Sequence, residues 1–291
     1  MRKIVFVVPV SYDGVSLKGF LRGYVCLSAR QTARLKRQPD GITRNGAPVI
    51  APDLLRAGDR IVLLFPEDDK IPAAVPLEIP VIYEDSDLLV LNKPAYMPMY
   101  PCPGHDRDSL ANAVAYHQLS CGERYAFRPV YRLDRDTTGL VLLAKNSFAA
   151  AKLAGNVRKT YLAVCEGILI GSGVIDLPIG LKLGHSIQRA VVPSGIRAVT
   201  RWRAVKAGQN YSLVAVRLKT GRTHQIRVHF SSCGHSLAGD DMYGGGLTAI
   251  GRQALHCSEI RFLHPVTGKR MRLFSVLPQD MNRLCRDKKI F

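Results

Sequence analysis

The stretch RPVYRLDRDTTGLVLLAK, residues 128–145, places one carboxylate, Asp134, between arginines and ahead of a nearly continuous apolar run. That run, residues 140–144, is typical of a strand buried on both faces. Hydroxyls and glycine favour non-repetitive backbone, so residues 137–139 are predicted to form a turn before the strand. Asp134 is therefore expected at the edge of a core, beside cations that favour its ionised form.

Two interpretations of this charged cluster are open. A carboxylate that lies beside a core and is kept ionised by cations suits a nucleophile or a proton-transfer group. Alternatively, Arg132, Asp134, Arg135 and Asp136 form a surface network of ion pairs at a strand end, which contributes little to stability. Spacing alone favours the ion-pair network, because such networks are common.

The composition indicates a polyanionic partner. The 291 residues include 41 Lys and Arg against 23 Asp and Glu, a formal net charge of +18, which is typical of nucleic-acid binding. No apolar stretch approaches the length of a spanning helix, and no strongly basic amphipathic helix has a broad apolar face. Nucleic acid is therefore the expected partner, and a membrane is not.

The start of the chain and the cysteines indicate a cytoplasmic protein. Residues 1–10 combine basic and apolar residues as a signal peptide does, but Pro9 interrupts them and residues 11–14 are a turn signal. We expect an opening strand there. The seven cysteines are scattered and odd in number, which indicates reduced thiols.

A compact unit is predicted over residues 1–66. Two short helices are expected within residues 15–37, with Ser28 as the N-cap of the second. Asn45-Gly46 is a strong hairpin signal, and a last strand is predicted over residues 60–65.

This unit resembles the S4-type RNA-binding domain in three short segments, Leu27-Ser28-Ala29-Arg30, Asn45-Gly46 and Ala57-Gly58-Asp59. For any single arginine, a solvated basic face is an equally good interpretation. As a group the arginines are expected to contact phosphates, because each such contact adds salt-sensitive affinity. The expected RNA-binding residues of this small α/β unit are Arg22, Arg30, Arg34 and Arg44.

A linker and a larger domain are predicted to follow. The proline-rich residues 67–80 indicate a semi-rigid linker, and residues 81–291 form the second domain. Within it, residues 81–94 predict a strand, an acidic turn and a second strand. Ser109 is a good N-cap for a helix over residues 110–118.

Two later segments carry candidate functional residues. Residues 158–164 alternate as a strand does, and Tyr161 within them by itself suits a core aromatic. Residues 224–233 predict a helix, with Thr223 as its N-cap and Gly234 as its stop.

The buried stripe of that helix is expected to hold Ile226, Phe230 and Cys233. Residues 220–223 precede it, and free amides at a helix start favour an anion such as phosphate. A metal site would recruit side chains that lie on different helix faces, with no carboxylate among them, so we predict none. Those side chains are His224, His229, His235 and Cys233.

Three motifs in order resemble the RluA-type pseudouridine synthase family. The first is Tyr131-Arg132-Leu133-Asp134, followed by Asp136-Thr137-Thr138-Gly139-Leu140. One departure is that many members carry His where this chain has Tyr131. The second motif is Lys159-Thr160-Tyr161-Leu162-Ala163, and the third contains His224-Gln225-Ile226-Arg227.

The resemblance implies an α+β pseudouridine synthase fold: a mixed, mainly antiparallel sheet with flanking helices and a basic central cleft. It implies isomerisation of a uridine in RNA to its C-glycoside, after the base has left the stack. Asp134 would be the nucleophile, Arg227 would pair with it, and Tyr161 would stack on the base. Arg132 would fill the vacated space, and Lys93 would line the cleft. No cofactor or metal is required, because no electrons or groups are transferred.

Alternatives remain open for both the substrate RNA and the reaction class. The N-terminal unit favours ribosomal RNA as the substrate, although transfer RNA stays open. The protein is expected to be a monomer. A glycoside hydrolase could use Asp134 and Asp136, but the flanking arginines do not provide the apolar setting that raises an acid's pKa. A non-catalytic RNA-binding assembly factor would leave the set of Asp134, Tyr161 and Arg227 unexplained.

Overall fold

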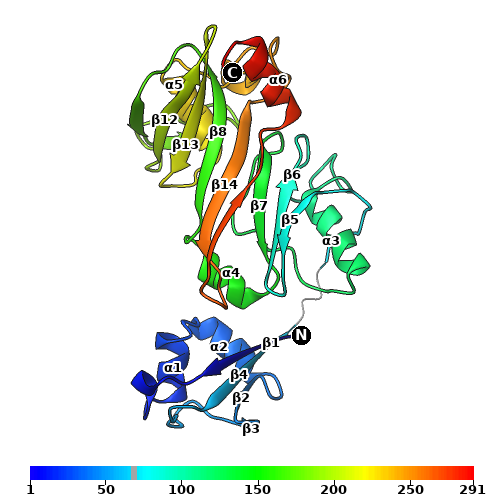
Figure 1. Ribbon diagram of the computed structural model, residues 1–291, viewed down its shortest axis with the longest axis vertical. Helices are drawn as coiled ribbons and strands as arrows, with labels where there is room; N and C mark the ends of the chain where they lie inside the picture. Colours follow the sequence, from blue (N-terminus) through cyan, green and yellow to red (C-terminus); the bar gives the residue numbers. More distant parts are fainter. Residues whose placement is uncertain (67–70) are drawn as a thin grey trace.

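The computed structural model describes residues 1–66 and 71–291. Residues 67–70, the start of the expected linker, lie outside the described residues. A small N-terminal unit lies below a much larger sheet, and the two are joined near helix α4 (Ser147–Leu153) (Figure 1). None of the described helices is both long enough and apolar enough to cross a membrane.

The N-terminal unit is an antiparallel sheet of four strands in the order β1-β4-β2-β3, with two helices. Ser28 caps the second helix in a capping box with Gln31, as expected. The predicted hairpin at Asn45-Gly46 is also confirmed, and both residues have positive φ. The elements are β1 (Arg2–Val7), η1 (Val10–Tyr12), α1 (Leu17–Gly23), α2 (Ala29–Lys36), β2 (Ile42–Arg44), β3 (Ala47–Pro48) and β4 (Arg60–Phe65).

The larger sheet has nine strands in the order β5-β6-β7-β14-β8-β13-β12-β9, and β15 pairs with β14. Every neighbouring pair is antiparallel except β7 and β14, which are parallel, so the expected mixed, mainly antiparallel sheet is confirmed. Its strands are β5 (Val81–Glu84), β6 (Leu88–Lys93), β7 (Thr138–Ala144), β8 (Arg158–Glu166), β9 (Ser172–Asp176), β12 (Val199–Ala207), β13 (Tyr211–Leu218), β14 (Leu255–Leu263) and β15 (Arg270–Phe274).

Helices cover this sheet on both faces. Ile226 and Phe230 of α5 join the main core with Tyr161 and Cys257, whereas Met281 of α6 packs with residues on the opposite face. The remaining elements are α3 (Leu110–Ser120), which Ser109 caps as predicted, β10 (Ile179–Leu181), β11 (Arg189–Val191), α5 (Gln225–Ser232), η2 (Asp241–Tyr243) and α6 (Gln279–Asp287).

The predicted turn over residues 137–139 is wrong, because β7 already begins at Thr138. The turn lies earlier, where the Thr137 amide donates to the Asp134 carbonyl. Parallel pairing with β14 extends the strand back to Thr138 and Gly139. Gly139 has a φ of +111°, and a Cβ there would lie 2.3 Å from the Cys257 carbonyl oxygen. Only glycine permits this close approach.

Helix α5 also departs from the prediction at its start. It begins at Gln225, and its N-cap is His224 in the left-handed region, with a φ of 56°, instead of Thr223. The Gln225 Oε1 accepts from the Arg222 amide and from the Thr220 hydroxyl, so this buried side chain organises the turn.

At the other end of α5, Gly234 has positive φ and ends the helix as expected. Cys233 is exposed and does not extend the buried stripe.

The N-terminal unit is anchored at the end of β7 that lies away from Asp134. Phe148, on α4 just after β7, is buried in the core of that unit, with its ring 5.9 Å from Phe6 and 5.8 Å from Phe65. Arg2 forms two bonds to Asp87, at 2.8 and 2.7 Å. The two parts of the chain therefore share a packed interface.

We expect Gly139→Ala to lower the free energy of unfolding far more than Gly46→Ala. Both glycines have positive φ, which costs an alanine about 1–2 kcal/mol. Only Gly139 also faces backbone atoms within 3 Å, and Gly46 faces open space, so overpacking adds roughly 1–3 kcal/mol at Gly139. Urea unfolding measures both variants. Equal losses would contradict the proposed close approach of β7 to β14.

Candidate active site

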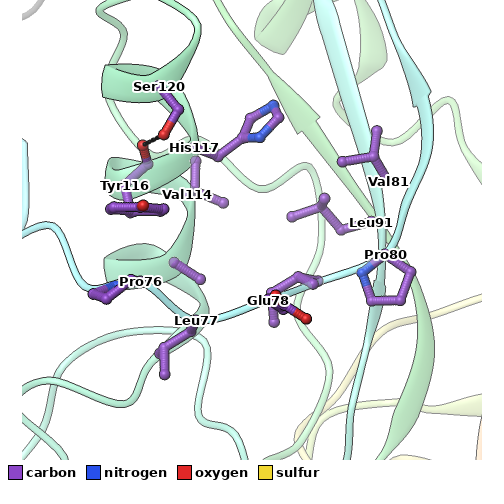
Figure 2. Close-up of a pocket in the computed structure, with 12 residues that line it drawn as sticks. Pro76, Leu77, Glu78, Pro80, Val81, Leu91, Val114, Tyr116, His117 and Ser120 are labelled. Carbon is purple, nitrogen blue, oxygen red and sulfur yellow. Dashed lines mark hydrogen bonds between the residues drawn. The ribbon is translucent and has the colours of Figure 1, made fainter.

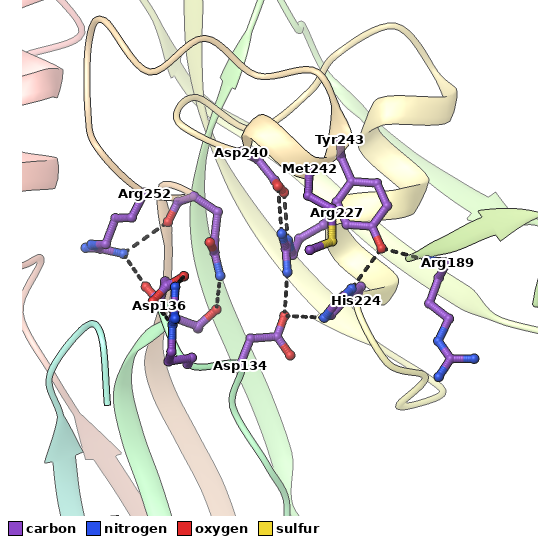
Figure 3. A network of polar contacts seen from close by, with 12 residues as sticks. Asp134, Asp136, Arg189, His224, Arg227, Asp240, Met242, Tyr243 and Arg252 are labelled. Carbon is purple, nitrogen blue, oxygen red and sulfur yellow. Dashed lines mark hydrogen bonds and ion pairs between the residues drawn. The ribbon is translucent and has the colours of Figure 1, made fainter. Parts of the chain in front are cut away.

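A buried arginine lies at the centre of the polar network that surrounds Asp134. Arg227 projects from α5 and binds Asp240 through two bonds of 2.7 Å, and the two side chains are 7% and 0% exposed. Burial opposes the charge of Arg227, but the bonds to Asp240 raise its pKa above the ordinary value. Its remaining Nη1 donates to Asp134 Oδ2 at 3.4 Å. Figure 3 shows this arrangement.

A histidine lies near the same oxygen of Asp134, beyond hydrogen-bond distance. The Tyr243 hydroxyl accepts from the Arg189 amide at 3.0 Å and therefore donates its own proton to His224 Nδ1, 2.8 Å away. This pattern assigns the imidazole proton to Nε2, which lies 3.9 Å from Asp134 Oδ2. Burial lowers the pKa of His224 although Asp134 opposes the shift, so the ring is neutral at pH 7.

Lys93 lies beneath the loop that carries Asp134. Its ammonium group donates to the carbonyls of Arg135 at 2.8 Å, Pro94 at 2.7 Å and Met97 at 2.9 Å. Only 1% of Lys93 is exposed, so the expected contact with RNA is wrong for this conformation: the side chain fixes the loop from inside. Burial lowers the pKa of Lys93 to about 7, although Asp136 opposes the shift.

A second buried cation holds the same loop from the other side. Arg252 donates to the Asp136 carbonyl at 3.0 Å and forms two bonds to Asp280 at the start of α6. Lys93 and Arg252 therefore fix the backbone on both residues that follow Asp134.

Two tyrosines line the sheet beside this loop. Tyr161 on β8 is opposite Cys257 on β14 and is 5% exposed. Burial, with smaller contributions from Cys257 and Asp134, raises its pKa well above the usual value, so its hydroxyl stays protonated. Tyr131, the departure from the family motif, donates to the Leu140 carbonyl at 2.9 Å. The Lys159 ammonium lies 4.5 Å from the Tyr131 ring.

The structure brings some expected residues together and separates others. Asp134 and Arg227 are in contact, and Tyr161 is close enough for the Asp134 charge to affect its pKa. Arg132 is exposed, with its guanidinium 5.7 Å from the centre of the Tyr100 ring. The four arginines expected to bind RNA are on α1, α2 and β2 of the N-terminal unit, which lies beyond the other end of β7 (Figure 1). Of these, Arg22, Arg30 and Arg34 are exposed, and Arg44 is partly buried and donates to the Leu54 carbonyl.

Sequence reasoning missed the roles of Asp240, Tyr243 and Arg252. Asp240 and Tyr243 follow α5 within 20 residues, but only the folded loop turns them back onto Arg227 and His224. His224 itself was considered as a metal ligand and quoted in the third motif, and no role beside Asp134 was assigned to it. The one available signal was that a buried arginine requires a carboxylate partner, and Asp240 follows the helix closely.

Other polar clusters and pockets are separate from this network. A pocket of about 560 Å³ lies between residues 76–81 and α3 and shares no residue with the Asp134 network (Figure 2). Asp85, Asp87 and His264 could together face a cation. Their atoms are already engaged, because Asp87 binds Arg2 and Asn146, and Asp85 binds His264.

The comparisons with known proteins give the fold and then the family. The fold is that of pseudouridine synthases: the solved structure of human RNA pseudouridylate synthase domain containing 1 matches with a TM-score of 0.57 and 24% identity, over 76% of this chain and 98% of that one. A model of the RNA pseudouridylate synthase family matches residues 87–232. The chain belongs to this family, of the RluA type, and is an isomerase that acts on RNA.

Two curated relatives align over most of their length. The uncharacterized RNA pseudouridine synthase YjbO of Bacillus subtilis is 39% identical over 270 residues, which cover 90% of this chain and 95% of the relative. The ribosomal large subunit pseudouridine synthase D of Pseudomonas aeruginosa is 37% identical, over 82% of this chain and 81% of the relative.

We expect Lys93→Met to flatten the pH dependence of stability between pH 7 and 9. In the folded protein Lys93 loses its proton near pH 7, whereas an unfolded lysine keeps it until about pH 10.4. The unfolded state thus binds more protons, and wild-type stability should rise by up to about 1.4 kcal/mol per pH unit in this window. Chemical unfolding at several pH values measures the slope. An unchanged slope in Lys93→Met would contradict the depressed pKa.

Proposed function

We propose that this chain isomerises uridines in large-subunit ribosomal RNA, with Asp134 as the covalent nucleophile. The observation that carries the proposal is the orientation of this carboxylate by Arg227, which donates to Oδ2 at 3.4 Å, with His224 Nε2 3.9 Å from the same oxygen. Within residues 1–66 and 71–291, both polar contacts of the Asp134 side chain end on Oδ2. This leaves Oδ1 for the substrate, on a side chain that is 29% exposed.

The reaction balances with Asp134 alone as the covalent group. In one route the carboxylate bonds to the ribose C1′ as the N1–C1′ bond breaks and leaves its electron pair on uracil. The base then turns, C5 bonds to C1′, and the ester bond returns its electrons to Asp134. C5 loses a proton to solvent and N1 gains one. In the other route the carboxylate adds to ring carbon C6, and the C5=C6 π pair moves onto the C4 carbonyl oxygen. The N1–C1′ bond then breaks and leaves its electron pair on N1, which gains a proton. The base turns, C5 bonds to C1′, and loss of the C5 proton restores the C5=C6 bond as the carboxylate leaves C6. Both routes use the Asp134 carboxylate as the nucleophile, and Arg227 donates to its Oδ2 at 3.4 Å.

The neighbouring side chains suit binding and positioning more than proton transfer. Tyr161 stays protonated because burial raises its pKa, so we assign it the role of a flat surface for the detached uracil and not that of a base. Arg132 lies over Tyr100, exposed and in the same motif as Asp134. A planar guanidinium there can stack on the bases that the flipped uridine leaves behind.

Ribosomal RNA is favoured over transfer RNA by two observations. Curated relatives over most of this chain are named ribosomal large subunit pseudouridine synthases. The N-terminal unit, proposed to be an S4-like RNA-binding domain, presents Arg22, Arg30 and Arg34 far along β7 from Asp134. A large folded RNA can reach both regions at once.

The hydrolase alternative lacks a second free carboxylate. Asp136 forms two bonds to Arg135, at 2.8 and 3.1 Å. An acid for glycoside hydrolysis needs an apolar setting, whereas Asp136 lies against an arginine side chain.

Asp134→Ala should abolish release of tritium from RNA labelled at uridine C5. Loss of a covalent nucleophile lowers the rate by at least about 10³-fold. The matched control is Asp136→Ala, which removes a carboxylate two residues away that already pairs with Arg135. Large-subunit ribosomal RNA and transfer RNA transcripts serve as parallel substrates. Release by Asp134→Ala would contradict the nucleophile, and release from transfer RNA alone would contradict the substrate.

Tyr243→Phe should lower kcat about tenfold and leave KM nearly unchanged. The hydroxyl holds the imidazole with its Nε2 proton towards Asp134, and one hydrogen bond contributes up to about 1.5 kcal/mol. Tyr211→Phe, which lies in a different core cluster, is the control. Equal kinetics of Tyr243→Phe and wild type would show that the tautomer of His224 does not matter for turnover.

A further inference from the structure

The larger sheet has a face that the proposed chemistry does not use. Tyr161, Cys257 and Trp202 point to the face that α5 covers. Side chains alternate along a strand, so their sequence neighbours point to the opposite face. Helix α6 covers one end of that opposite face, where Val164 and Leu213 pack against Met281. The other end contains a cluster that we term the outer arginine face: Arg158, Arg201, Arg203, Arg217, Arg261 and Arg272.

The strand registers place these arginines beside one another. Arg201 on β12 is directly opposite Arg217 on β13. Farther along the same face, Arg261 on β14 is opposite both Arg158 on β8 and Arg272 on β15. Side chains that are directly opposite have their Cβ atoms about 4.5–5.5 Å apart, and like charges in such positions destabilise a sheet. Repulsion between these facing arginines therefore destabilises the sheet at two places, the Arg201–Arg217 pair and the row of Arg158, Arg261 and Arg272.

Carboxylates relieve only part of this repulsion. Glu259 bonds to Arg261 at 2.8 Å and also pairs with Arg272. In the described part of the chain, Arg158, Arg201, Arg203 and Arg217 form no ion pair, and the Nε of Arg217 donates only to the Thr160 hydroxyl at 3.3 Å. All four are exposed.

An aromatic side chain completes the face. Phe274 on β15 is opposite Glu259 and 55% exposed, and the Arg272 guanidinium lies 4.6 Å from the centre of its ring. Guanidinium groups beside an exposed ring are the combination that contacts phosphates and stacks on bases.

We propose that the outer arginine face is a second RNA-binding surface, which holds the sugar-phosphate backbone of a duplex segment of the substrate. A polyanion is the partner that turns clustered, unpaired arginines from a cost into an attraction. RNA is the polyanion on which this family acts, so the inference rests on the family and not on the choice of ribosomal RNA. The surface lies on the face of the sheet opposite Tyr161, so its substrate must be larger than the segment at Asp134.

The test compares R201Q/R217Q with R283Q/R286Q, which removes the same charge from the exposed side of α6. Binding to an RNA duplex of about 30 base pairs is measured against salt concentration. Two lost phosphate contacts should reduce the slope of log K against log salt by about 1.8 and weaken binding roughly 10- to 60-fold near 0.1 M salt. The control variant R283Q/R286Q should change both the salt slope and the affinity less than R201Q/R217Q does.

Two further measurements separate the proposal from its alternatives. Turnover of a short uridine-containing stem-loop at saturation should equal that of wild type, because these arginines do not touch the reacting base. The thermal midpoint of R201Q/R217Q should stay level or rise, because a like-charge pair is removed. A raised midpoint with unchanged RNA affinity and salt slope would overturn the proposal and leave a solvated basic face. An equal loss of affinity in both double variants would also overturn it, since the effect would then be net charge alone.

Discussion

The buried pair of Arg227 and Asp240 is the interaction on which the arrangement of the site depends. A guanidinium with 6% exposure needs a carboxylate, and two bonds of 2.7 Å to a fully buried Asp240 meet that need. Because both bonds fix the plane of the guanidinium, its remaining Nη1 has a set direction, towards Asp134. The orientation of Asp134 thus depends on the Arg227–Asp240 pair, although Asp134 does not contact Asp240 directly. Lys93 and Arg252 complete the constraint by holding the loop that carries Asp134.

Much of the fold could be predicted from local patterns, and the errors have a common physical cause. Caps such as Ser28 and Ser109 and the Asn45-Gly46 hairpin depend on nearby residues, and all were predicted correctly. The turn expected at residues 137–139 failed because β14, more than 100 residues later, pairs with this segment. Thr223 is not the N-cap of α5, because the buried Gln225 side chain organises the turn before the helix.

The site shows the same division between local and long-range information. The pairing of Arg227 with Asp134 was expected from a family motif and is present. Lys93 was expected to line the cleft and bind RNA, yet it is 1% exposed and three backbone carbonyls provide its bonds. No local pattern encodes those acceptors. Buried cations such as Arg227 fix the loop structure, whereas we propose that the exposed arginines of the outer arginine face bind RNA.

We propose that a flipped uridine meets Asp134 while Arg227 stays bonded to Asp240. A crystal structure with RNA that carries 5-fluorouridine at a modified position tests it most directly, because fluorine at C5 blocks loss of the C5 proton. We predict an Asp134 oxygen bonded to C1′ or C6, or within about 3–3.5 Å of one of them, with both Arg227–Asp240 bonds intact. A nucleotide whose C1′ and C6 both lie beyond reach of Asp134, or an Arg227 that has left Asp240 to bind phosphate, would contradict the account.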